Sequence, residues 1–124
     1  MSVKKLHDRG QTLRYPTGKV LGIINTKAEL KRLIAAMKEA GFGEIELLQG
    51  KEGIRLLKRV GKFFFSDIEM VMINRQICEL EAGHTIVAIK TPSHRVDEAL
   101  NLASKNGARR SVHFGTVAVT WHSK

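Results

Sequence analysis

Histidine, cysteine and serine are the side chains in this sequence that could ligate a metal or act as nucleophiles. The five histidines lie at positions 7, 84, 94, 113 and 122, and no two have the i, i+4 spacing that places two zinc ligands on one helical face. His113 and His122 would meet only if neighbouring strands point them to one face of a sheet. Cys78, Ser93 and Ser111 have no base and orienting acid at motif spacing. We therefore expect surface histidines, no metal site and no catalytic residue.

Glycines and carboxylates also carry no catalytic motif. The glycines at positions 41, 43, 50 and 53 match neither a dinucleotide-binding nor a phosphate-binding loop. Glu44 and Glu46 alternate onto one strand face, where an acid–base pair is conceivable but an exposed polar face is the more common arrangement. We expect no cofactor and no enzyme activity.

Positive charge is concentrated on one predicted helix, residues 51–65. At 100° per residue its cations fall within an arc of about 100°, with apolar residues on the opposite side. These cations are Lys51, Arg55, Lys58, Arg59 and Lys62. Each like-charged i, i+4 pair costs only about 0.2–0.5 kcal/mol, so the stripe is tolerable as a solvated face, although an anionic partner would offset the repulsion. If the protein binds a polyanion, we expect this face to be the contact, extended by Arg109 and Arg110.

The first half of the chain shows the periodicity of a strand, a helix and a second strand. An apolar run at residues 20–24 is typical of a buried strand. Thr26 and Glu29 form a capping-box pattern at the start of the helix that follows, and Gly41 ends that helix. Residues 44–48 then alternate between apolar and polar positions, which predicts the second strand.

The second half repeats this order. Residues 84–89 predict a strand, residues 91–93 a helix start with proline near the first turn, residues 106–107 the helix end, and residues 111–114 another strand. Between the halves lie the cationic helix and a further helix from residue 66 or 67 to residue 82. A last short strand is expected at residues 116–121.

Two βαβ units with right-handed crossovers build a four-stranded sheet with its helices on one face. The expected fold class is α+β, a ferredoxin-like sandwich with two extra helices between the halves and a short extra C-terminal strand. A helix-free sheet face is usually covered, so we expect a homo-oligomer with Val117, Val119 and Trp121 at its interface.

The charge balance favours anionic partners. Twenty-one Lys and Arg against twelve Asp and Glu give a net charge of +9, which suits nucleic acid, phosphorylated ligands or an anionic surface. A single cysteine excludes an internal disulfide and indicates a reducing compartment. The first residues contain no signal-peptide apolar region, and no apolar run approaches a membrane span, so a cytoplasmic location is expected. Residues 1–18 predict a basic, flexible arm, and residues 19–124 a single domain.

Several short segments carry a family resemblance. They are the helix-to-strand step through Gly83 at residues 79–89, the turn at residues 106–108, the closing pair at residues 114–115, the first strand at residues 20–24 and the helix start at residues 27–29. Together they resemble the small bacterial general-stress-protein domain of the heat-induced type.

The resemblance covers roughly residues 19–121. It implies a bacterial cytoplasmic protein with a ferredoxin-like fold, and it supplies no catalytic residue. The basic arm and helix differ from that family, whose members are often acidic. The leading functional expectation is a non-enzymatic, stress-associated or regulatory binding domain that self-associates. The alternative is a protein that binds nucleic acid or another polyanion through the cationic helix face.

Overall fold

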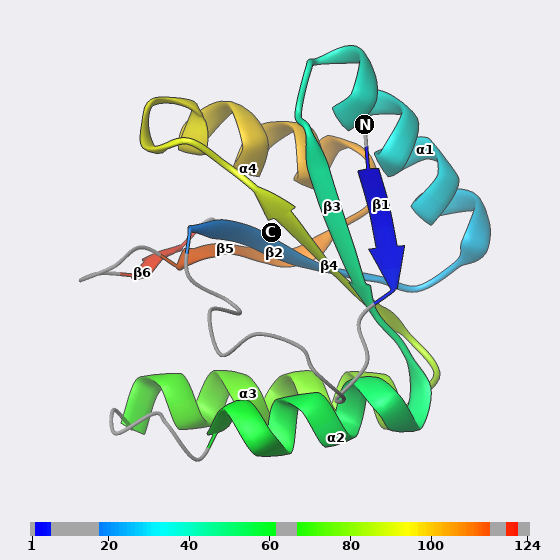
Figure 1. Cartoon of the computed structure of the whole chain (residues 1–124), viewed down its shortest axis with the longest axis vertical. Coiled ribbons are helices and arrows are strands. Elements are labelled where there is room, and N and C mark those ends of the chain that lie inside the picture. Colours follow the sequence, from blue (N-terminus) through cyan, green and yellow to red (C-terminus); the bar gives the residue numbers. More distant parts are fainter. Residues whose placement is uncertain (1, 6–17, 62–66, 115–118, 122–124) are drawn as a thin grey trace.

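The structure, a computed structural model, describes residues 2–5, 18–61, 67–114 and 119–121. The elements follow in the order β1 (Ser2–Lys5), β2 (Lys19–Ile24), α1 (Lys27–Glu39), β3 (Glu44–Leu48), α2 (Gly50–Gly61), α3 (Asp67–Glu81), β4 (Thr85–Lys90), the short 3-10 helix η1 (Ser93–Arg95), α4 (Val96–Lys105), β5 (Arg109–Phe114) and β6 (Val119–Trp121) (Figure 1). Within this part of the chain, no helix is both long and apolar enough to cross a bilayer.

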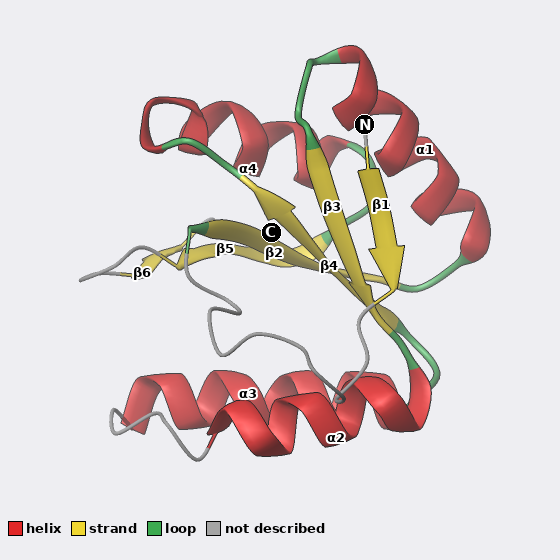
Figure 2. Ribbon diagram, viewed as in Figure 1, coloured by secondary structure: helices red, strands yellow, loops and turns green. Residues whose placement is uncertain are grey.

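All strands join one sheet in the order β1-β3-β4-β2-β5-β6 (Figure 2). The four central strands, β3-β4-β2-β5, are antiparallel to their neighbours. Strand β2 pairs with β4 over six residues, from Lys19 opposite Lys90 to Ile24 opposite Thr85. Each of the connections β2-α1-β3 and β4-α4-β5 leaves one strand between the two that it joins. The chain therefore has an α+β fold, as the sequence predicted, with the two expected helices inserted between β3 and β4.

Helix α1 begins and ends where its local sequence predicts. The backbone N–H of Glu29 donates to the Thr26 hydroxyl at 3.1 Å, which satisfies one of the amides that a helix start leaves unpaired. At the other end, Gly41 takes a positive φ of 85°, and the next amide, that of Phe42, donates back to the Met37 carbonyl at 3.0 Å. This turn directs Phe42 into the core and starts β3.

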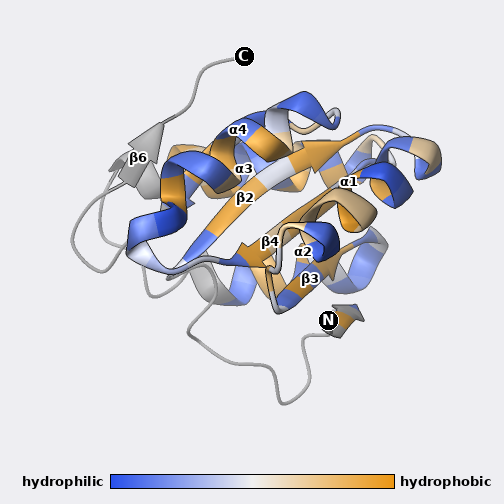
Figure 3. Cartoon of the chain, turned by 90° about the horizontal axis from the view of Figure 1, so that it is seen from above, coloured by the Kyte–Doolittle hydropathy of each residue, from blue (hydrophilic) through white to orange (hydrophobic). Residues whose placement is uncertain are grey.

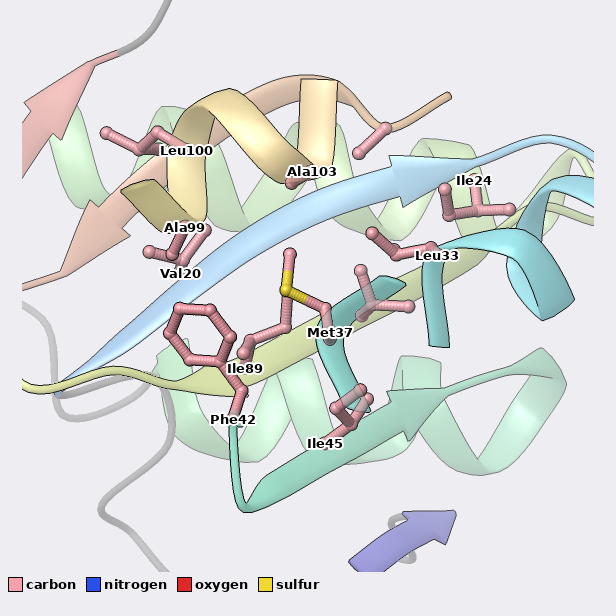
Figure 4. Packing of buried hydrophobic residues seen from close by; sticks show 12 residues of the cluster. Val20, Ile24, Leu33, Met37, Phe42, Ile45, Ile89, Ala99, Leu100 and Ala103 are labelled. Atoms are coloured by element: carbon pink, nitrogen blue, oxygen red, sulfur yellow. The ribbon is translucent and has the colours of Figure 1, made fainter. Parts of the chain in front are cut away.

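One face of the sheet packs against α1 and α4. The side chains of that core are fully or almost fully buried and come from both helices, from the sheet and from the turn after α1 (Figure 4). They include Val20, Leu33, Met37, Phe42, Ile45, Val87, Ile89, Leu100 and Ala103. Figure 3 shows the polar residues of α1 and α4 turned mainly away from the apolar strands beneath them. This amphipathic pattern is what identified both helices in the sequence.

The opposite face of the sheet is also covered, which corrects the expectation of a helix-free face. Helices α2 and α3 lie on this face (Figure 1). Side chains of β2, β3, β4 and β5 that alternate with those of the first core pack against them. The cluster contains Leu21, Leu48, Leu56, Leu57, Met72, Ile73, Leu80, Ile86 and Val112. The apolar stripes of α2 and α3 need a surface to cover, and the free sheet face supplies it. Self-association was expected because a sheet face without helices needs a cover, and α2 and α3 provide that cover within the chain.

A β-bulge distorts the pairing of β2 with β5. Leu21 lies opposite Val112, and Ile23 lies opposite Arg109, so one residue more is present on β5 than on β2. Within the bulge, Arg110 has a φ of 54°, the only positive φ of a non-glycine residue in the described part of the chain. The extra residue shifts the alternation, and Arg109 therefore points to the α3 side of the sheet, as Val112 does.

The N-terminal segment differs in part from the predicted arm. Residues Ser2–Lys5 form β1, which pairs in parallel with β3 at one edge of the sheet. This strand is not predicted from the sequence, because its four residues show little apolar alternation and their pairing depends on a distant partner. Residues 6–17 of the predicted arm lie outside the described residues.

Candidate functional site

Helix α2 is positioned by close packing at its first turn. The Gly53 amide donates to the Gln49 carbonyl at 3.1 Å. A Cβ at Gly53 would lie 3.0 Å from the Leu80 side chain of α3 and 3.2 Å from Leu48 of β3. The absence of a side chain at residue 53 therefore lets α2 approach both elements, and this fixes which face of α2 is turned outward.

Three of the five cations predicted to form one stripe are exposed on the outward face of α2. Lys51, Arg55 and Lys58 are exposed, and Arg59 is half-buried at the edge of that face. The opposite side of the helix is anchored by Leu56 and Leu57, which are 1% and 0% exposed. Lys62, the fifth predicted member, lies outside the described residues.

Helix α3 adds a cation that the sequence analysis missed. Arg75 is exposed on the side of α3 turned away from the sheet, because the buried residues Met72, Ile73 and Gln76 occupy the inner side. Helices α2 and α3 pack against each other as the outer layer on this face (Figure 1). The exposure of Arg75 could have been predicted from the apolar stripe of α3, since Arg75 falls opposite Ile73 at 100° per residue.

Arg109 does not extend the cationic face as a free charge. Its Nη2 donates to Glu79 Oε1 of α3 at 2.8 Å and to Asn25 Oδ1 at 2.6 Å. The same Glu79 oxygen lies 2.6 Å from His84 Nδ1. The bulge turns the Arg109 guanidinium toward α3, where an acidic partner compensates its charge, and contact of Arg109 with a polyanion stays a prediction. Arg110 is exposed.

Glu79 is held ionised by this cluster. Burial by itself raises the pKa of the Glu79 carboxyl, but hydrogen bonds from His84 and Arg109, together with their charges, outweigh burial and lower the pKa below its ordinary value. The cluster joins the C-terminal half of α3 to the start of β5. Since the cluster connects two elements and Arg109 compensates the charge of Glu79, we assign the cluster a structural role.

The other predicted reactive groups are separated from one another. Glu46 pairs with Lys19, and Glu44 lies 3.7 Å from Lys90, so each carboxylate of the conceivable acid–base pair has its own cation. Cys78 is exposed on α3. The Ser111 hydroxyl is buried with no hydrogen-bond partner among the described residues.

The histidines form no cluster where they are described. His113 is half-buried on β5, and burial lowers its pKa. Its predicted neighbour, His122, lies outside the described residues. In the part of the chain that the structure describes, no group of three or more His, Cys, Asp or Glu side chains could hold a metal ion.

Two of the clefts that described residues line open at opposite ends of the central strands. The larger, about 630 Å³, is lined mainly by the turn after α1 and the end of β4, and includes Phe42, Lys90 and Arg95. Arg95 is already engaged there, since its guanidinium stacks 4.0 Å above the Phe42 ring and donates to Glu98 at 2.9 Å. The smaller, about 160 Å³, lies between the starts of α1 and α2 beside His84.

The predicted oligomer contacts cannot be placed. Val117 lies outside the described residues, and the side chains of Val119 and Trp121, although on β6, are not described. Their interface role stays a prediction.

No protein-family model, no curated protein and no solved structure was found to match this chain. The site must therefore be interpreted from its own geometry.

Proposed function

We propose that this chain is a ferredoxin-like α+β domain that binds polyanions through the outward face of α2. The order β3-β4-β2-β5 and the two βαβ connections support the fold assignment. The observation that carries the functional proposal is the exposure of Lys51, Arg55 and Lys58 on one face of a helix whose other face is anchored in the core.

A rigid array of cations favours an anionic partner for an energetic reason. Flexible side-chain charges on a mobile chain must lose backbone entropy when they bind, at about 1–2 kcal/mol per residue fixed. The α2 backbone is already ordered before binding, so its three cations add their attraction without that cost. Release of counterions from a polyanion then supplies a favourable, salt-dependent free energy.

Helix α1 provides a charge-matched control. It carries Lys31, Arg32 and Lys38, which are also exposed, on the opposite face of the sheet. The α2 variant replaces Lys51, Arg55 and Lys58 by Gln, and the α1 variant replaces Lys31, Arg32 and Lys38 by Gln. Each variant lowers the formal charge of +9 by three, so a difference between them reports position and not net charge.

The test is elution from immobilised heparin, a linear sulfated polyanion, in a salt gradient. We expect the α2 variant to elute at clearly lower salt than the α1 variant, with both unfolding within about 0.5 kcal/mol of the parent protein because the changes are on the surface. Equal elution of the two variants would show that net charge alone governs retention, and the proposal would fail.

A further inference from the structure

The outer layer made by α2 and α3 exposes more cationic than acidic side chains among its described residues. Among the described side chains that are exposed on these helices, four are cationic and one is acidic. The cations are Lys51, Arg55, Lys58 and Arg75, and the acid is Glu81 near the end of α3. Since the two helices pack against each other, these cations belong to one layer of the molecule.

This surface does not have the properties of a membrane-binding helix. An interfacial helix inserts an apolar face into the headgroup boundary. The apolar faces of α2 and α3 are instead buried against the sheet, with Leu57 at 0% and Ile73 at 2% exposed. The large apolar side chain left outside on the described part of this layer is Val71, which is too little to anchor the protein in lipid.

Among the described residues, this surface offers no platform for unpaired bases. Proteins that hold single strands stack the bases on exposed aromatic rings. The large apolar side chains exposed on the described residues are Val3 and Val71, and Phe42 is buried, so no described aromatic ring is available. Contact with phosphates alone, which is how proteins bind duplexes without reading their sequence, needs no such platform.

The spacing of the cations suits a duplex. Lys51 and Lys58 are seven residues apart on α2, which is about 10 Å along a helix axis. Over such a length a double helix presents about six phosphates, at one charge per 1.7 Å of axis. Arg75 on α3, the helix that packs against α2, adds a fourth exposed cation to the same layer.

We propose that the outward faces of α2 and α3 together bind the phosphate backbone of duplex nucleic acid, independently of sequence. This inference rests on the proposed function and specifies its partner. It predicts that Arg75, which has no role if α2 acts alone, contributes one phosphate contact.

The experiment measures fluorescence anisotropy of a labelled 20-base-pair DNA duplex over a range of salt concentrations, with the parent protein, Arg75→Gln and the control Arg32→Gln on α1. Each lost phosphate contact lowers the slope of log affinity against log salt by about 0.9. We expect Arg75→Gln to lower the slope by that amount and Arg32→Gln to leave it unchanged. Duplexes of unrelated sequence should bind equally well.

Three outcomes would overturn the inference and leave the heparin result intact. Tighter binding to a single strand of the same length would exclude the duplex as the preferred partner. Binding to vesicles of mixed phosphatidylserine and phosphatidylcholine but not to duplex DNA would identify a lipid surface instead. An unchanged slope for Arg75→Gln would show that α3 is not part of the surface. Loss of the difference between the α2 and α1 variants on heparin would instead remove the proposed function itself.

Discussion

At Gly22, in the middle of β2, the fold leaves no room for a side chain. A Cβ at that position would lie 2.8 Å from the Cβ of Ala108, closer than two carbon atoms pack without displacement. Gly22 also lies opposite the bulge on β5, beside the turn between α4 and β5 that contains Ala108. The small residues at both positions allow α4 and β5 to pack against β2.

We predict that Gly22→Ala lowers the free energy of unfolding by about 1–3 kcal/mol, because one methyl group is forced into a filled core. Ala108→Gly should restore space for it, so the double variant should be more stable than the sum of the single effects predicts. Urea unfolding of the four proteins measures this coupling. Additive effects would show that the contact between the two positions is not what excludes a side chain at residue 22.

At the scale of elements, the position of α3 depends on a polar cluster as well as on its apolar stripe. Glu79 binds Arg109 of β5 and His84, which precedes β4. Arg109 reaches Glu79 because the bulge at Arg110 reverses the side to which it points. The bulge, the ion pair and the docking of α3 therefore depend on one another.

This cluster predicts a defined acid dependence. Since the pKa of Glu79 is lowered in the folded protein, its contribution to stability is fully present above the ordinary carboxyl value of about 4.3 and is lost as the pH falls through the lower folded value. Glu79→Gln should lower the free energy of unfolding by roughly 1 kcal/mol at neutral pH. The difference from the parent protein should shrink as the pH falls below about 4.

Thermal unfolding of both proteins at pH 3 to 7 measures this gap. A gap that stays constant to pH 3 would mean that the ionised form of Glu79 is not what stabilises the contact. A gap that widens in acid would contradict the predicted direction of the pKa shift.

The elements themselves could largely be predicted from the sequence, because their signals are local. The Thr26 cap, the Gly41 stop and the stripe on α2 each depend on residues within one or two turns, and the structure has them where they were expected. The sequence did not show which face of the sheet α2 and α3 cover. The apolar stripes of these two helices look like those of α1 and α4. The partner of each stripe is decided only in three dimensions.

The part of the candidate site that lies on one helix could be predicted for the same reason. The part that depends on how strands pair could not. The stripe from Lys51 to Lys58 follows from helical periodicity alone. The neutralisation of Arg109 depends on a one-residue bulge and on Glu79, thirty positions earlier in the chain. Alternation along β5 cannot show such a shift, because the bulge itself has no local sequence signature here.

At the scale of the whole molecule, the sheet divides the cations into two layers. Helices α2 and α3 expose one set on one side, and α1 exposes a comparable set on the other. Net charge alone would favour neither side. The resemblance to the stress-protein domain, self-association and a cytoplasmic location stay predictions, and none of them chooses between the two layers.

The most direct measurement is a map of the surface that a polyanion contacts. Amide NMR spectra of this 124-residue chain can be followed during titration with an unlabelled DNA duplex at low salt. We predict that chemical-shift changes concentrate on the outward residues of α2 and α3, including Lys51, Arg55 and Arg75, and that the amides of α1 do not shift. Changes centred on α1, changes spread evenly over the surface, or no change at low salt would contradict the account.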